Sequence, residues 1–135
     1  MKDSGEIIKE ASTRVKKLWG YKDNPEDLSA CIHELAVLNF GLGTWLAEFE
    51  DAERVAKTDV DLEHAEIVEK YINQDMPVSR AEVKAKIDLG DKRRDYNQIV
   101  KSVQMVKICR HDIETVIDTG RSRLSLIKQD MQRAE

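Results

Sequence analysis

One stretch near the end of the chain decides the fold: YNQIVKSVQMVKICRHDIETVIDTGRSRLSLIKQDM, residues 96–131. Within it, alternating steps of three and four mark a stripe of residues, here called the seam: Tyr96, Ile99, Val103, Val106, Arg110, Ile113, Ile117, Gly120, Leu124, Ile127 and Met131. Such steps place side chains along one face of a long helix, as in the heptad repeat of coiled coils. Nine of the eleven residues are apolar or aromatic, and Arg110 and Gly120 are the exceptions. The stretch therefore predicts a long helix that buries one face.

A second stripe with the same spacing lies upstream and predicts the helix that covers the seam. Its members are Leu28, Cys31, Leu35, Leu38, Leu42, Trp45, Phe49, Ala52 and Ala56. Three further apolar residues widen the stripe, and there we expect the best-covered core: Val37, Phe40 and Leu46. Asn24 and Pro25 precede the stripe, and Asn followed by Pro is typical of a helix N-terminus. We expect this helix to span residues 25–73.

Residues 73–78 contain Asn, Asp and Pro and are expected to form a loop. Ser79 and Glu82 then have the spacing of a capping box, which predicts that the next helix spans residues 79–133. Gly90 interrupts its pattern, but Ala85 and Leu89 keep the register of the seam, so we expect the helix to continue through it.

These elements together predict an all-α fold. A short amphipathic helix over residues 5–19 precedes the two long ones. Two long helices joined by a short loop form an antiparallel, coiled-coil-like helical hairpin. We expect one helical domain over residues 1–135, with the short helix packed against the hairpin.

Charge is distributed unevenly between the two predicted arms. Residues 22–79 carry four basic and fourteen acidic residues, whereas residues 80–135 carry thirteen basic and nine acidic residues. Opposite charges favour either antiparallel pairing of the arms or a face that binds a polyanion. Charged residues make up 36% of the chain and aromatic residues 5%, which is typical of long exposed helices. Such a thin core favours self-association.

The sequence indicates a cytoplasmic protein that does not enter a membrane. Cys31 and Cys109 lie in apolar-periodic stretches without C-x-x-C spacing, and we expect buried free thiols in a reducing compartment. The first ten residues, MKDSGEIIKE, lack the apolar core of a signal peptide. No apolar run approaches the roughly 18 residues of a membrane span.

No catalytic or metal-binding pattern is present in the sequence. His33, His64 and His111 are far apart, no HExxH motif occurs, and no glycine-rich phosphate-binding motif occurs. We therefore expect no enzyme, no cofactor and no metal site. Arg110 has two interpretations: a buried polar residue that sets helix register against Glu48 or Glu53, or a charge that faces a ligand.

Two groups of basic residues are candidates for nucleic-acid binding. Their members are Lys84, Lys86, Lys92, Arg93 and Arg94 in the first group, and Arg121, Arg123 and Lys128 in the second. Such groups track a phosphate backbone without reading its sequence. The alternative is a solvated face whose cations pair with Asp91, Asp95 or the acidic arm. The residues themselves leave both interpretations open.

The stretch Ile117–Met131, with the tail Gln129-Asp130-Met131-Gln132-Arg133, resembles the end of the UvsY family of phage recombination mediators. Lys84-Ala85-Lys86-Ile87-Asp88 is similar to a segment of that family that is tied to single-stranded DNA. The resemblance implies a non-catalytic homo-oligomer that helps load a RecA-like recombinase onto DNA covered by single-strand-binding protein. It also implies that Lys84 and Lys86 contact the DNA.

The C-terminal helix would then hold the copies together, through Ile113, Ile117, Gly120, Leu124, Ile127 and Met131. We expect the turns after Gly120 to lack a mate within the chain. Two other functions fit the same sequence: a helical scaffold or adaptor without DNA binding, and an inhibitor that binds a host protein through its acidic face.

Overall fold

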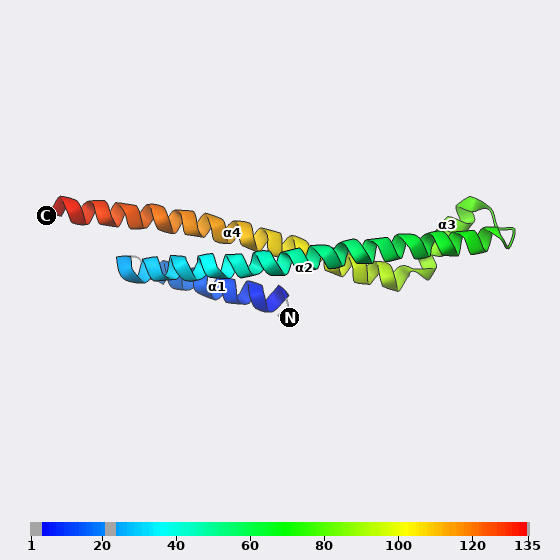
Figure 1. The fold of residues 1–135 in the computed structure, drawn as a ribbon, viewed down its shortest axis with the longest axis horizontal. Coiled ribbons are helices and arrows are strands. Elements are labelled where there is room, and N and C mark those ends of the chain that lie inside the picture. Colours follow the sequence, from blue (N-terminus) through cyan, green and yellow to red (C-terminus); the bar gives the residue numbers. More distant parts are fainter. Residues whose placement is uncertain (1–3, 21–23, 135) are drawn as a thin grey trace. The chain divides into compact units, whose positions relative to one another are not determined.

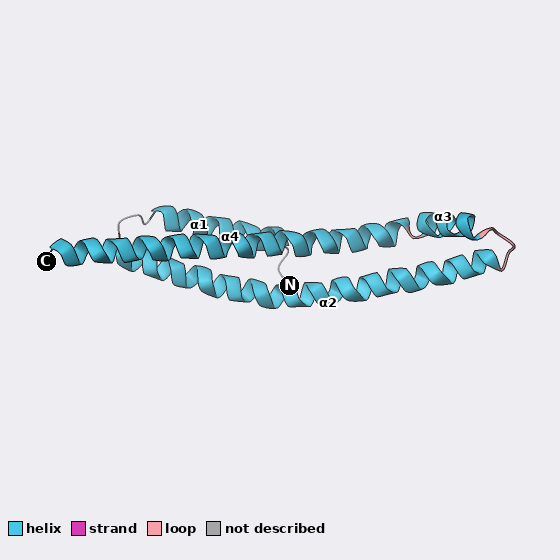
Figure 2. Cartoon of the chain, turned by 90° about the horizontal axis from the view of Figure 1, so that it is seen from above, coloured by secondary structure: helices cyan, strands magenta, loops and turns pink. Residues whose placement is uncertain are grey.

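The computed structural model describes residues 4–20 and 24–134, and these form four helices without a strand. The helices are α1 (Ser4–Gly20), α2 (Pro25–Ile72), α3 (Val78–Asp88) and α4 (Gly90–Ala134) (Figure 1). The predicted all-α hairpin with a short N-terminal helix is confirmed. Figure 2 shows the loop between α2 and α3 and the short interruption between α3 and α4.

The start of α2 is capped as the sequence predicts. The side-chain Oδ1 of Asn24 accepts hydrogen bonds from the backbone N–H groups of Glu26 at 3.1 Å and Asp27 at 3.2 Å. These N–H groups have no partner within the helix, so the cap satisfies them. The acidic residues Glu26 and Asp27 also lie in the first turn, where the helix dipole favours negative charge.

The predicted capping box at Ser79 is wrong, because the helix begins earlier. α3 starts at Val78 with Pro77 at the capping position, and no side chain caps it. The carbonyl oxygen of Pro77 accepts the first helical hydrogen bond from Ala81 N–H at 2.9 Å. Pro77 has φ −57° and ψ 144°, so its backbone is extended and the helix begins at the next residue. Ser79 therefore lies inside the first turn and not at the capping position.

The third predicted helix is divided at Leu89, where the sequence predicts continuity. Leu89 has φ −94° and ψ 12°, outside ideal helical geometry. Helical hydrogen bonds still meet on both sides of it, from Leu89 N–H to Ala85 O at 3.0 Å and from Arg93 N–H to Leu89 O at 2.9 Å. Ala85 and Leu89 are buried, so the predicted register of the seam holds across the interruption.

The sequence predicts one domain, whereas the helices form two compact units. Unit 1 comprises Met1–Leu46 and Gln104–Glu135, and unit 2 comprises Ala47–Val103. Unit 2 is an antiparallel pair in which the second half of α2 faces α3 and the start of α4, with Val60, Ala81 and Val103 in its core. Both α2 and α4 contribute to each unit.

Unit 1 contains α1, the first half of α2 and the second half of α4. Its core includes the deeply buried seam residues Val106 and Ile113 of α4, together with Leu28 and Leu35 of α2. An ion pair between Arg14 and Glu34 joins α1 to α2. The Sγ of Cys31 lies 3.6 Å from the carbonyl oxygen of Arg14 in the same contact.

The widened part of the α2 stripe is only partly covered. Leu46 is buried, but 59% of Val37 and 79% of Phe40 is exposed, so the prediction of a best-covered core at these two residues is wrong. The first half of α2 is apolar around most of its circumference, and its neighbours in unit 1 cover one side.

By length and composition α2 could also cross a membrane, although the absence of a long apolar run predicts no such span. It contains an 18-residue window with mean hydropathy 1.2 and at most two charged residues. His33, Glu34 and Asn39 interrupt the apolar residues, as do two glycines and Thr44, which is why no continuous apolar run stands out. Core helices of soluble proteins meet the same criterion, and 33% of the window is buried within the chain.

Candidate nucleic-acid interface

The first basic group lies on α3 and the first turn of α4, in unit 2. Ala81 and Ala85 are fully buried on one face of α3. Their small side chains allow α3 to pack closely, and the helical repeat then turns the opposite face outward. Val83 and Ile87 occupy that outward face and are largely exposed. Lys84 and Lys86 are also exposed, but successive residues of a helix are about 100° apart, so the two lysines project from opposite flanks of α3. Lys84 lies on the flank nearer to α2.

Lys84 is held in place by an aromatic ring. Its ammonium lies 4.7 Å from the centroid of the Tyr71 ring at the end of α2, which is the geometry of a cation–π interaction. The Tyr71 hydroxyl donates a hydrogen bond to the carboxylate of Asp88, and this bond raises the pKa of Tyr71. The ring is therefore anchored at its hydroxyl, and it positions the Lys84 charge on the surface.

Lys86 and Arg94 are the most accessible other cations of this group. Lys86 is exposed and has no ion pair with any described residue. Arg94 pairs with Asp91 at 3.0 Å within the helix, but its side chain is largely exposed. An exposed pair of this kind contributes little and is easily exchanged for a phosphate.

Lys92 and Arg93 are turned toward α2 instead. Lys92 forms an ion pair with Glu63 of the acidic arm, and the hydrogen bond to Glu63 raises the pKa of Lys92. Arg93 is half-buried, and its Nε is buried without a hydrogen-bond partner in the described chain. It lines a small cavity of about 260 Å³ together with Asp61 and Tyr96. Lys92 therefore pairs with the acidic arm, which is one of the two interpretations that the sequence left open.

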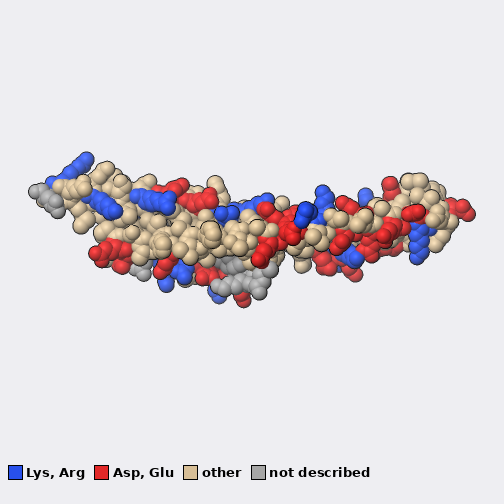
Figure 3. Space-filling model, in the orientation of Figure 1, with Lys and Arg blue, Asp and Glu red and all other residues tan. Residues whose placement is uncertain are grey.

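The second basic group lies on α4 within unit 1, and Figure 3 shows basic side chains along this end of the helix. Arg121 and Lys128 are exposed, whereas Arg123 is half-buried. Lys128 borders a shallow hollow that Pro25, Glu26 and His33 of α2 also line.

The residues predicted to join copies of the chain are mostly used within unit 1. Ile113 and Ile117 are 1% and 6% exposed, and Gly120 is buried. Leu124 and Ile127 are half-buried, and Met131 is 57% exposed.

The turns after Gly120 do have a mate in the chain, because Lys128 lies beside the first turns of α2. The expectation that they lack one is wrong. In an antiparallel hairpin whose loop is centred near residue 75, residue 128 falls opposite the start of α2, so the loop position could have revealed it.

Arg110 packs against α2 inside unit 1 without an acidic partner. Its Nε donates a hydrogen bond to Asn39 Oδ1 at 3.4 Å, and neither Glu48 nor Glu53 pairs with it. Its guanidinium lies over Gly43, where an added Cβ would be 3.2 Å from Arg110 Cζ. The glycine makes room for the charged group, and the periodicity alone did not reveal this pairing.

Within the described residues, no group of three or more His, Cys, Asp or Glu side chains is arranged to hold a metal ion. Unit 2 presents exposed cations along α3 and the start of α4, and one of them, Lys84, is fixed by an aromatic ring. Compared with known proteins, the chain matches no protein-family model, no curated protein and no solved structure.

Proposed function

We propose that the protein is a non-enzymatic accessory of recombination that binds single-stranded DNA through the exposed cations of α3. The observation that carries the proposal is the exposure of Lys84 and Lys86 on the two flanks of α3, with Lys84 held over Tyr71. A fixed cation loses less side-chain freedom when it binds a phosphate. The same two lysines lie in the segment that is similar to the part of the UvsY family tied to single-stranded DNA, while the main resemblance to that family lies in residues 117–131.

Binding of this kind uses phosphates and is sensitive to salt. Each neutralised phosphate of a single strand contributes a slope of about −0.7 in log Kobs against log salt concentration. Lys84, Lys86 and Arg94 together therefore give a slope of about −2 per protomer. The side chains exposed on α3 include no aromatic residue for base stacking, so little sequence preference is expected.

The test is fluorescence anisotropy of labelled single-stranded DNA over a series of salt concentrations. The double variant Lys84→Ala/Lys86→Ala should weaken binding about fivefold to thirtyfold at low salt, because about 1–2 kcal/mol of phosphate contacts is lost. Its matched control is Lys70→Ala/Lys101→Ala, which removes the same charge from two exposed positions of unit 2 outside α3. Absence of binding by the unaltered protein at low salt would overturn the proposal.

The role in loading a recombinase rests on the resemblance to that family. It predicts that the protein shortens the lag before a RecA-like recombinase assembles on DNA covered by single-strand-binding protein. Self-association belongs to the same proposal, and among the six residues predicted to join copies of the chain Met131 is the one left largely exposed.

The acidic arm favours a second candidate, an adaptor or inhibitor that binds a basic protein surface. Residues 47–72 of α2 carry nine acidic and three basic residues. Asp59, Asp61, Glu66 and Glu69 are exposed, and acidic side chains are frequent on the visible face of unit 2 (Figure 3). Binding of a basic partner without any affinity for DNA would favour this candidate.

A further inference from the structure

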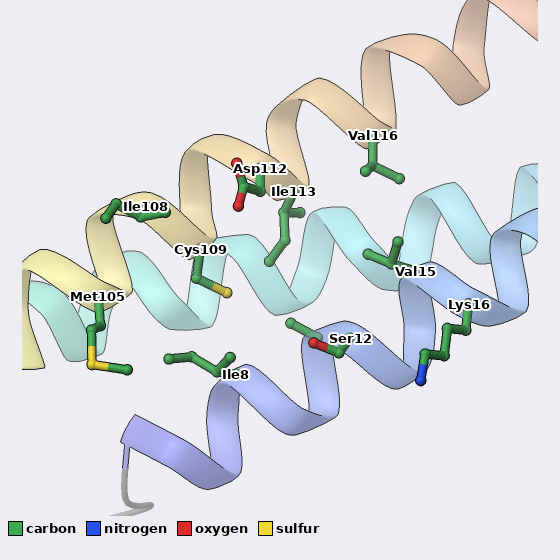
Figure 4. Close-up of a pocket in the computed structure, with 11 residues that line it drawn as sticks. Ile8, Ser12, Val15, Lys16, Met105, Ile108, Cys109, Asp112, Ile113 and Val116 are labelled. Atoms are coloured by element: carbon green, nitrogen blue, oxygen red, sulfur yellow. The ribbon is translucent and has the colours of Figure 1, made fainter.

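A groove runs between α1 and α4 within unit 1 (Figure 4). Its volume is about 520 Å³, within the range of binding pockets. Figure 4 shows Ile8 beneath Met105 and Cys109, while Val15 and Lys16 lie toward Val116, so α1 and α4 run in the same direction along it. The groove follows α4 from Met105 to Val116, which is about three helical turns or roughly 17 Å.

The lining of the groove is apolar and partly open to solvent. Ala11 and Ile113 lie buried beneath it, whereas Met105 is 40% and Ile108 is 62% exposed. Exposed aliphatic side chains along three turns of a helix leave apolar area in water, and covering them is favourable. Three helices form unit 1, and a fourth helix lying in this groove would complete a four-helix bundle.

The two rims of the groove carry opposite charges. Lys16 lies on the α1 side and Asp112 on the α4 side. Both are exposed, and neither has an ion pair with a described residue. A fatty acid has one charged head and can complement Lys16 alone, whereas a helix can present an acidic side to Lys16 and a basic side to Asp112. The charges therefore favour a helix over a single-headed lipid.

We propose that this groove binds an amphipathic helix of another protein, with apolar residues at helical spacing between an acidic edge and a basic edge. The acidic edge faces Lys16 and the basic edge faces Asp112. This interaction goes beyond the proposed function, since it lies within unit 1 and requires no DNA. It also gives a use to Met105 and Ile108, whose exposure nothing else in the described chain accounts for.

Cys109 reports occupancy of the groove. Its sulfur points into the groove in Figure 4, and its side chain is half-buried. Burial, with a smaller effect of Asp112, raises the pKa of the thiol, so labelling is done at alkaline pH, where more thiolate is present. Cys31 is buried in the core of unit 1 and serves as the internal control when both thiols are followed by mass spectrometry.

The probe is a designed helical peptide of about 18 residues, with leucines at steps of three and four, glutamates along one edge and lysines along the other. The full-length protein is titrated with it, and a peptide of the same composition with scrambled order is the control. We expect saturable binding of the designed peptide and at least threefold slower labelling of Cys109, with labelling of Cys31 unchanged.

Two aspartate variants test the location. Ile108→Asp places a charge in the groove and should weaken peptide binding at least tenfold. Leu126→Asp is the matched control, because Leu126 is 61% exposed on the same helix and lies outside the groove. Circular dichroism checks that both variants keep their helix content. Equal affinity of the two variants would overturn the proposal.

The charges are tested by reversal. Lys16→Glu or Asp112→Lys alone gives both rims one sign and should weaken binding about twofold to tenfold. The double reversal restores opposite signs, and the peptide then binds in the other direction with its original affinity. No binding of the designed peptide would overturn the proposal. So would protection of Cys109 that rises with protein concentration and accompanies dimer formation in light scattering, because a second copy would then fill the groove.

Discussion

Two glycines in the first half of α2 have different surroundings. An added Cβ at Gly41 would meet no described atom within 4 Å, whereas at Gly43 it would lie 3.2 Å from the guanidinium of Arg110. Glycine inside a helix costs about 0.5–1 kcal/mol relative to alanine. At Gly43 the absent side chain leaves room for Arg110 of α4 to pack against α2, which offsets the loss of helix stability. At Gly41 no described residue uses the space, so the loss has no such compensation.

Gly41→Ala should raise the free energy of unfolding by about 0.5–1 kcal/mol, because it adds helix propensity without a clash. Gly43→Ala should raise it less, since Arg110 must move. Urea unfolding followed by circular dichroism measures both. In an Arg110→Ala background Gly43→Ala should recover the full gain, and equal effects of the two alanines in the unaltered protein would contradict the role given to Arg110.

At the scale of the element, the boundaries of the helices follow from a few hydrogen bonds. Asn24 satisfies two N–H groups at the start of α2, and the carbonyl of Pro77 starts α3. Leu89 interrupts the helix without losing its register. Thus the apolar periodicity sets the face that each helix buries, and the caps decide where each helix begins.

Asn24→Ala should lower the free energy of unfolding by about 0.5–2 kcal/mol, because two N–H groups of α2 lose their acceptor. Asn73→Ala is the control, since the same substitution there affects an exposed loop residue whose side chain makes no hydrogen bond to a described residue. Thermal and urea unfolding give the comparison. A loss at Asn73 as large as that at Asn24 would show that the cap is not the cause.

At the scale of the whole molecule, two compact units share two continuous helices. α2 and α4 each contribute to both units, and their backbone hydrogen bonds continue through the positions where the units meet in sequence. Helix formation is cooperative along such a ladder. We therefore expect the chain to unfold in a single transition although its core is divided.

One substitution in each core tests this expectation. Val60→Ala in unit 2 and Ile113→Val in unit 1 remove buried methyl groups and should cost about 1–3 and 0.5–1.5 kcal/mol, respectively. The two losses should add within about 0.5 kcal/mol in the double variant, since the residues belong to different compact units. Two separate transitions in urea, each moved by one of the substitutions, would contradict single-transition unfolding.

The residue types in the sequence reveal most members of the candidate site. They do not reveal which of these cations contact other residues of the chain and which are available for a ligand. Lys84, Lys86, Lys92, Arg93 and Arg94 look equivalent in the sequence. The structure pairs Lys92 with Glu63, turns Arg93 toward α2 and places Lys84 over Tyr71. These differences depend on the neighbouring arm, where Tyr71 is 13 positions from Lys84 and Glu63 is 29 positions from Lys92 along the chain.

By itself the sequence determined the helical class, the hairpin, the cap at Asn24 and the register of the seam. These features follow from local hydrogen bonding and from apolar residues that recur every three or four positions. Tertiary structure decided the division into two units, the exposure of Phe40, the pairing of Arg110 with Asn39 over Gly43, and the groove between α1 and α4. The physical reason is that periodicity identifies which face of a helix is apolar, whereas the extent of its burial depends on how many other helices reach that face.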